Sequence, residues 1–170
     1  MSQSKEELKA KMIADPSSLA TLGGGIALAG GLLGSSWGIG LAASAGIATI
    51  SQDHRQLKNV IILAAIPMSQ TLYGLIILII TLRVVAPKIV AMPDPVGSGL
   101  AVVALGVMAA VAFATSAAYK GSVLAAGIAF LPKTRGRILT NCLMLAVFVE
   151  LIAVLGVVFT ILALSMLGLM

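Results

Sequence analysis

The sequence predicts an all-α membrane protein whose four transmembrane helices form two tandem hairpin repeats. Hydrophobic residues make up 59% of the 170 residues and charged residues only 10%, and the mean hydropathy is +1.11. This composition excludes an ordinary soluble domain, which needs more polar residues to cover its surface. Long uncharged segments and an internal repeat then indicate how many helices there are and how they are arranged.

Polar clusters divide the chain into four apolar segments, at 21–50, 59–82, 96–131 and 138–170. Each segment exceeds the roughly 20 residues, at about 1.5 Å per residue, that a transmembrane helix requires. None of them is long enough to cross twice. We therefore expect four spans, joined by a polar turn at 52–58, a proline-containing connection at 83–95 and a second polar turn at 132–137.

These segments divide the chain into an amino-terminal extension at 1–19, a first hairpin at 20–92 and a second hairpin at 93–170. Within the extension, 4–7 resembles a capping box and predicts a short helix at the membrane interface; a solvated tail is the alternative. Four spans place both termini on one face of the membrane. Because each side carries five Lys and Arg residues, loop charge leaves the orientation open.

An internal repeat relates the two hairpins. Residues 35–47 align without a gap on 116–128, and after one residue of slippage Gln70 aligns on Glu150. The chain is therefore a duplicated hairpin. Since each repeat contains two helices, the repeats point the same way, which argues against the inverted repeats of many secondary transporters.

The first helix of each repeat is rich in small residues. Four-residue spacing places small side chains on one strip of each helix, namely Gly30, Gly34 and Gly38 in the first repeat and Ala110, Ala114 and Ala118 in the second. Such strips allow helices to approach closely. The second helices carry bulky residues, as expected of a face turned to lipid. The pattern predicts a ring of several copies with small residues inside, and it fits a compact four-helix monomer or dimer equally well.

Two charged residues, Lys120 and Glu150, lie deep within the predicted spans. Such residues are rare and costly in membranes, and they usually serve function. Counted from the polar turns, Lys120, Glu150 and Gln70 each lie 12 or 13 residues into the membrane, or roughly 18 to 20 Å. We therefore expect a layer of polar groups near the middle of the membrane.

The sequence near Gln70 supplies further oxygen atoms at this depth. Ser69, Gln70 and Tyr73 can bind a cation or form hydrogen bonds, and Pro67 cannot donate a backbone bond within its helix. A carboxylate with hydroxyl, amide and carbonyl oxygens suits a small hard cation or a proton. An ion carrier needs an occupied, neutral form that can face lipid and a charged, empty form that cannot. The alternative is that Glu150 pairs with Lys120 only to stabilise the bundle.

The duplicated hairpin and the segments 67–74 (PMSQTLYG) and 149–156 (VELIAVLG) resemble the membrane rotor (proteolipid, K or c) subunit of V-type and A-type ATPases, especially the sodium-translocating branch. The resemblance covers about 20–168. It implies a ring of identical copies in the lipid bilayer, turning against a stator membrane subunit. It also implies cytoplasmic hairpin turns that bind central-stalk subunits, with both termini on the opposite face. The basic residues of these turns are Arg55, Lys58, Lys133, Arg135 and Arg137.

The same resemblance assigns roles to single residues. It implies that Glu150 is the ion-binding carboxylate and that Tyr73 holds it by a hydrogen bond. The further ligands that it implies are the side chains of Gln70 and Ser69 and the backbone carbonyl of Ile66. Lys120 departs from the sodium-binding members, which have glutamine at this place, because an ammonium group offers no acceptor. Lys120 either points at Glu150 and competes with sodium, or turns toward water and leaves a simpler site.

We therefore expect a rotor-ring subunit that carries sodium or a proton, with sodium favoured because Gln70, Ser69 and Tyr73 exceed what a proton needs. ATP hydrolysis is expected in a separate sector, since the chain contains no phosphate-binding Gly-x-x-x-x-Gly-Lys motif. We expect neither an organic cofactor nor a nucleic-acid partner. The alternatives are a structural proteolipid with a permanent Lys–Glu bridge and a small proton-coupled cation or multidrug antiporter. The aromatic content of 4% argues against the antiporter.

Overall fold

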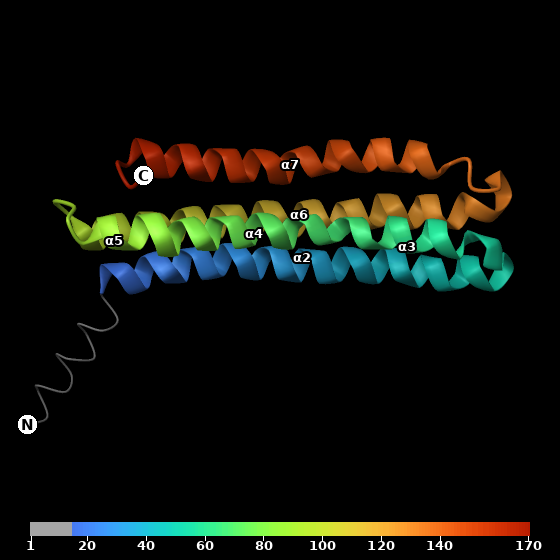
Figure 1. Cartoon of the computed structure of the whole chain (residues 1–170), viewed down its shortest axis with the longest axis horizontal. Coiled ribbons are helices and arrows are strands. Elements are labelled where there is room, and N and C mark those ends of the chain that lie inside the picture. The colour runs from blue at the N-terminus through green and yellow to red at the C-terminus, as the bar shows by residue number, and fades with distance from the viewer. Residues whose placement is uncertain (1–14) are drawn as a thin grey trace, which may run out of the picture.

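Four long helical spans lie side by side in the computed structural model, which describes residues 15–170 (Figure 1). They are Pro16–Gln52, His54–Ile89, Pro95–Thr134 and Leu139–Met166, and each is long and apolar enough to cross a membrane. The predicted all-α class with four spans is confirmed, and the chain is a multi-pass integral membrane protein. The interfacial helix expected around 4–7 lies outside the described residues.

The first span is a single helix, α2 (Pro16–Gln52), with a capped beginning and a polar end. The Asp15 carboxylate accepts a hydrogen bond of 3.0 Å from the backbone N–H of Ser18, and Pro16 occupies the first turn. Both features favour a helix start. After Gln52 the chain turns through η1 (His54–Gln56), where Asp53 accepts a bond of 3.0 Å from the Arg55 N–H.

The second span is interrupted twice. It consists of α3 (Leu57–Ala65), the 3-10 turn η2 (Ile66–Met68), α4 (Ser69–Ile80), the π-helical turn η3 (Thr81–Val85) and α5 (Ala86–Ile89). Pro67 lies in the first interruption because it has no N–H to continue the α-helical bonding pattern. The helix continues to Ile89, so the connection expected at 83–95 is too long. Pro87 does not end the span because it lies in the first turn of α5, where a missing N–H costs little.

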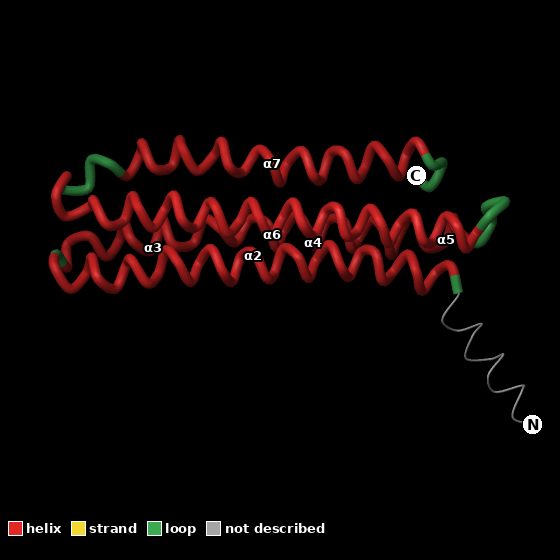
Figure 2. Tube along the Cα trace, turned by 180° about the vertical axis from the view of Figure 1, so that it is seen from behind, coloured by secondary structure: helices red, strands yellow, loops and turns green. Residues whose placement is uncertain are grey.

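The second hairpin comprises α6 (Pro95–Thr134) and α7 (Leu139–Met166). Asp94 caps α6 by accepting a 3.0 Å bond from the Gly97 N–H. The helix runs through Pro132, expected in the turn, and stops before Arg135 and Gly136, whose φ angles are 52° and 81°. Both hairpin turns lie at one end of the bundle, and the beginning of α2 and the C-terminus lie at the other (Figures 1 and 2).

Helices α2 and α6 pack along the predicted strip of small residues. A Cβ atom built on Gly30 would collide with the Cα of Ala110, and one on Gly34 would lie 2.6 Å from the Cα of Ala114. Neither position has room for a side chain, so close approach through these glycines is confirmed. Further along, a Cβ built on Gly38 would collide with the Ala117 carbonyl oxygen, so the contact misses Ala118. It drifts because a four-residue spacing exceeds the 3.6 residues of a helical turn.

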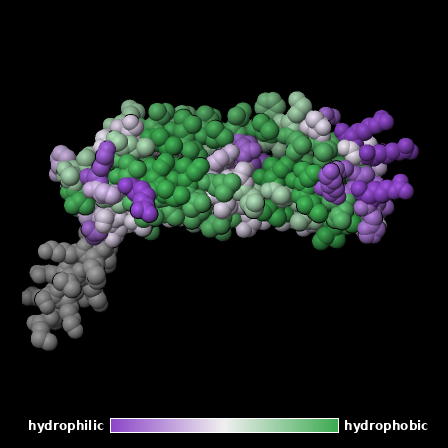
Figure 3. Space-filling view, in the orientation of Figure 1, coloured by the Kyte–Doolittle hydropathy of each residue, from purple (hydrophilic) through white to green (hydrophobic). Residues whose placement is uncertain are grey.

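The outer surface of the bundle is mostly apolar. Even in the first span, only 39% of an apolar stretch of 18 residues is buried within the chain, and the share is smaller in the other three spans. Hydrophilic side chains gather at the two ends, and a small hydrophilic patch interrupts the hydrophobic band about midway along the face in Figure 3. Such a surface must be covered by lipid or by further protein.

The packing of α2 on α6 predicts that one glycine substitution lowers the stability of the protein and that another does not. Gly34→Ala forces the backbones apart and is expected to lower the free energy of unfolding by about 1 to 3 kcal/mol. Gly40→Ala is the matched control, since a Cβ there meets nothing within 4 Å, and it is expected to be neutral or stabilising by up to about 1 kcal/mol. Thermal unfolding of the purified protein in detergent measures both. Equal melting of the two variants would contradict this packing.

Candidate functional site

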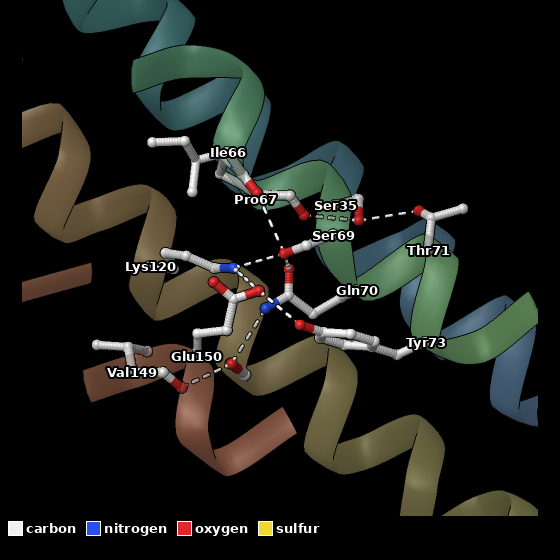
Figure 4. A network of polar contacts seen from close by, with 11 residues as sticks. Ser35, Ile66, Pro67, Ser69, Gln70, Thr71, Tyr73, Lys120, Val149 and Glu150 are labelled. Carbon is white, nitrogen blue, oxygen red and sulfur yellow. Dashed lines mark hydrogen bonds and ion pairs between the residues drawn. The ribbon is translucent and has the colours of Figure 1, made fainter. Parts of the chain in front are cut away.

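The polar residues predicted at mid-membrane meet in one network contributed by α4, α6 and α7 (Figure 4). The side chains of Gln70 and Lys120 are 0% exposed. The Glu150 side chain is 20% exposed, so this side chain lies at the edge of the network and reaches the outer surface of the chain. The common depth inferred for these three residues is confirmed by their contacts.

Glu150 is held by a cation and a hydroxyl group. The Lys120 ammonium nitrogen lies 3.2 Å from Glu150 Oε1, and the Tyr73 hydroxyl donates a 3.0 Å hydrogen bond to the same oxygen. Of the two orientations expected for Lys120, the structure has the one that points at Glu150. A carboxylate thus meets donors from both neighbouring helices, α6 and α4.

Lys120 also binds the oxygen atoms at the start of α4. Its ammonium donates a 2.8 Å bond to Ser69 Oγ. That hydroxyl lies 3.2 Å from the Ile66 carbonyl oxygen and 3.2 Å from Gln70 Oε1, and its single proton can serve one of them at a time. The interruption at Pro67 thus places the predicted oxygen ligands Ile66, Ser69 and Gln70 together.

Two serines complete the network and were not among the predicted site residues. Ser116 accepts a 3.3 Å bond from Gln70 Nε2 and donates a 2.8 Å bond to the Val149 carbonyl, which ties α4 to α6 and α6 to α7. Ser35 donates a 2.8 Å bond to the Pro67 carbonyl in the first hairpin. The internal repeat aligns Ser35 with Ser116, and this pairing was the signal that would have identified them.

The Lys120–Glu150 pair is electrically neutral as a unit. Burying either charge alone in a membrane is expensive, and the attraction between the two charges offsets part of that cost. Removing one partner of a buried pair costs about 3 to 5 kcal/mol because the other charge is left without compensation. The network can therefore hold one positive charge beside Glu150, and Lys120 supplies it in this structure.

The basic residues of the two turns lie far from this network, at the hairpin end of the bundle. The turns contact each other there, since a Cβ built on Gly136 would lie 3.2 Å from the side-chain oxygen of Gln56 in η1. Hydrogen bonds from the Gln56 side chain and the Arg55 N–H hold the pKa of Asp53 below its ordinary value. The resulting surface is strongly basic, with Arg55, Lys58, Lys133, Arg135 and Arg137 against one carboxylate.

Residues 22–81 match the family of the C subunit of ATP synthase. The matched segment is less than half of the chain and corresponds to most of the first hairpin. It includes Ser69, Gln70 and Tyr73 but ends before Lys120 and Glu150. No curated protein matches the chain.

The bond between Tyr73 and Glu150 predicts a difference between two tyrosine variants. Tyr73→Phe removes the hydroxyl but keeps the ring, whose centroid lies 6.3 Å from that of Phe113. We expect the free energy of unfolding to fall by about 1.5 kcal/mol. This is the lower end of the range for a hydrogen bond to a charged group, because Glu150 is partly exposed. Tyr119→Phe, on the exposed face of α6, is the control and should leave the melting temperature unchanged. Equal melting temperatures for both variants and the wild type would show that the Tyr73 bond contributes nothing.

Proposed function

We propose that the chain is a rotor-ring subunit of a V/A-type ATPase that carries a monovalent cation across the membrane on Glu150. ATP hydrolysis, in this proposal, takes place in a separate sector. The observation that carries the proposal is the buried polar network centred on Glu150 within a duplicated hairpin. The match of residues 22–81 to the C subunit of ATP synthase supports it from an independent direction.

The position of Glu150 suits a carrier that must meet a second protein. Its side chain is 20% exposed, and its neighbours Leu151 and Ile152 are 48% and 54% exposed. The group therefore lies at the outer surface of the chain, within reach of a stator subunit. When it is paired with a cation, the site is neutral and can pass through lipid at little cost.

The V/A-type assignment rests on the duplication. Two hairpins occur in one chain, and the position equivalent to Glu150 in the first hairpin is Gln70. Each chain thus offers one ion-carrying carboxylate among four helices. The segments 67–74 and 149–156 carry the more specific resemblance to the V/A-type rotor subunit.

The proposed partners follow from the two kinds of surface. The apolar sides of the bundle require copies of the chain and lipid, which a ring in the bilayer supplies. The basic hairpin end suits an acidic surface on the central stalk. In this arrangement the hairpin turns face the cytoplasm and both termini lie on the other side.

The cation carried is sodium or a proton. The oxygen atoms of Ser69, Gln70 and Ile66 are ligands of the kind that sodium prefers. They are the reason why the sequence favours sodium over a proton. Against this stands the ammonium of Lys120, which lies within the same set of ligands at 2.8 Å from Ser69 Oγ.

A second candidate function is favoured by the Lys120–Glu150 ion pair. If this bridge of 3.2 Å is permanent, the chain is a structural proteolipid that occupies a ring without carrying ions. A permanent bridge keeps Glu150 ionised and closed to reagents that attack the protonated carboxyl group.

Mass measurement and carbodiimide labelling of the purified, detergent-solubilised assembly test the proposal together. We expect a ring of many copies in which a hydrophobic carbodiimide labels Glu150 and stops ATP-driven ion transport by the reconstituted complex. Glu150→Gln should be neither labelled nor active, whereas Asp53→Asn, which changes a carboxylate in the turn, should be labelled like the wild type. An unlabelled ring would favour the structural proteolipid, and a dimer would contradict the rotor.

A further inference from the structure

We propose that Lys120 determines the ion specificity of this site by acting as a tethered cation. Its ammonium occupies the position at which a sodium ion would bind, so the wild-type site excludes sodium. The inference rests on the proposed function, in which Glu150 carries the ion. The inference excludes sodium, and a proton can be carried at this site only while Lys120 is neutral, because a protonated Glu150 beside the ammonium would leave the same net positive charge.

The first support is the set of atoms that surround the ammonium. Lys120 Nζ lies 3.2 Å from Glu150 Oε1 and 2.8 Å from Ser69 Oγ. These are the negatively charged oxygen and the hydroxyl oxygen that a small cation would use. The Lys120 side chain is 0% exposed, so the ammonium is enclosed in the site and does not reach toward water.

The second support is that the other oxygen atoms expected to bind sodium already have hydrogen-bond partners. Gln70 Oε1 lies 3.2 Å from the Ser69 hydroxyl, and Gln70 Nε2 bonds Ser116 at 3.3 Å. The Ile66 carbonyl oxygen lies 3.2 Å from the same hydroxyl. The backbone N–H of Ser69 bonds the Ile66 carbonyl oxygen, so the single hydroxyl proton of Ser69 can serve Gln70 Oε1. Both oxygen atoms thus have a hydrogen-bond donor while the ammonium occupies the site.

The third support is charge. Glu150 supplies one negative charge, and the ammonium of Lys120 neutralises it. A sodium ion added to this site would leave a net positive charge inside the membrane and would lie a few ångströms from another cation. Sodium and the ammonium therefore compete for one place, and the ammonium is covalently attached.

Substitution of Lys120 should then open the site to sodium. In Lys120→Gln the ammonium is replaced by an amide whose oxygen can accept or bind a cation. Glu150 is left as an unpaired charge in the membrane, which sodium can neutralise. The variant should therefore gain sodium binding and also depend on sodium for its stability.

The experiment compares purified full-length assemblies in sodium and in choline at the same pH and ionic strength. Binding of radioactive sodium and thermal unfolding are measured on the same samples. The wild type is expected to bind no sodium and to melt at the same temperature in both salts. Lys120→Gln is expected to bind one sodium ion per chain and to melt higher in sodium. At sodium about ten times its Kd, carbodiimide labelling of Glu150 in this variant should slow about tenfold.

Three control variants separate this effect from a general loss of charge. Lys120→Arg keeps the positive charge and should remain insensitive to sodium. Lys133→Gln removes a positive charge from the hairpin end, 5.5 Å above the Phe130 ring, and should also remain insensitive. Lys120→Gln combined with Glu150→Gln removes the carboxylate and should lose the sodium binding gained by the single variant.

Sodium binding by the wild type would overturn the inference, and this result does not depend on how any variant folds. An assembled Lys120→Gln variant that binds no sodium would overturn it as well. If that variant fails to assemble, sodium binding by the wild type decides the matter. The mass of the wild-type assembly is a separate readout, so failure of the rotor proposal is distinguished from failure of the assignment to Lys120.

Discussion

A charged carboxylate inside the membrane needs a compensating positive charge, and this constraint organises the centre of the molecule. Glu150 meets the ammonium of Lys120 at 3.2 Å, and the Tyr73 hydroxyl donates to the same carboxylate oxygen. These three residues come from different helices, so their contacts form only when α4, α6 and α7 lie at the correct depth and rotation. The polar network is therefore both a product of the helix packing and a restraint on it.

The packing that meets this constraint is set by backbone contact between α2 and α6. Helices α2 and α6 lie almost backbone to backbone because Gly30 and Gly34 have no side chains, and no side chain would fit at either position. Interhelical bonds from Ser35 to the Pro67 carbonyl and from Ser116 to the Val149 carbonyl then fix the second helix of each hairpin on the first. Small residues permit the approach, and the serines set the depth.

Much of this arrangement could be predicted from the sequence, because span length, the repeat and the depth of polar residues are regular properties of a chain in a membrane. The spans, the glycine strip and the common level of Gln70, Lys120 and Glu150 are examples. The continuation of the second span past Pro87 was missed, since a proline near a helix start is tolerated in a way that composition does not reveal. The direction of the Lys120 side chain and the hydrogen bonds of Ser116 depend on which faces of α4, α6 and α7 are in contact. The periodicity of the sequence does not determine these contacts.

If the chain is the rotor subunit proposed above, the difference between its two repeats has a consequence for energy conversion. Both hairpins keep a serine that bonds the second helix, but the first has the amide of Gln70 where the second has the carboxylate of Glu150. A ring of such chains has half as many carriers as one of the same circumference with a carboxylate in every hairpin. Fewer ions then cross in each revolution, so the free energy of a fixed number of ATP molecules is divided among fewer ions. In the proposed ring, the duplication would lower the number of ions carried per ATP, which would allow pumping against a steeper gradient.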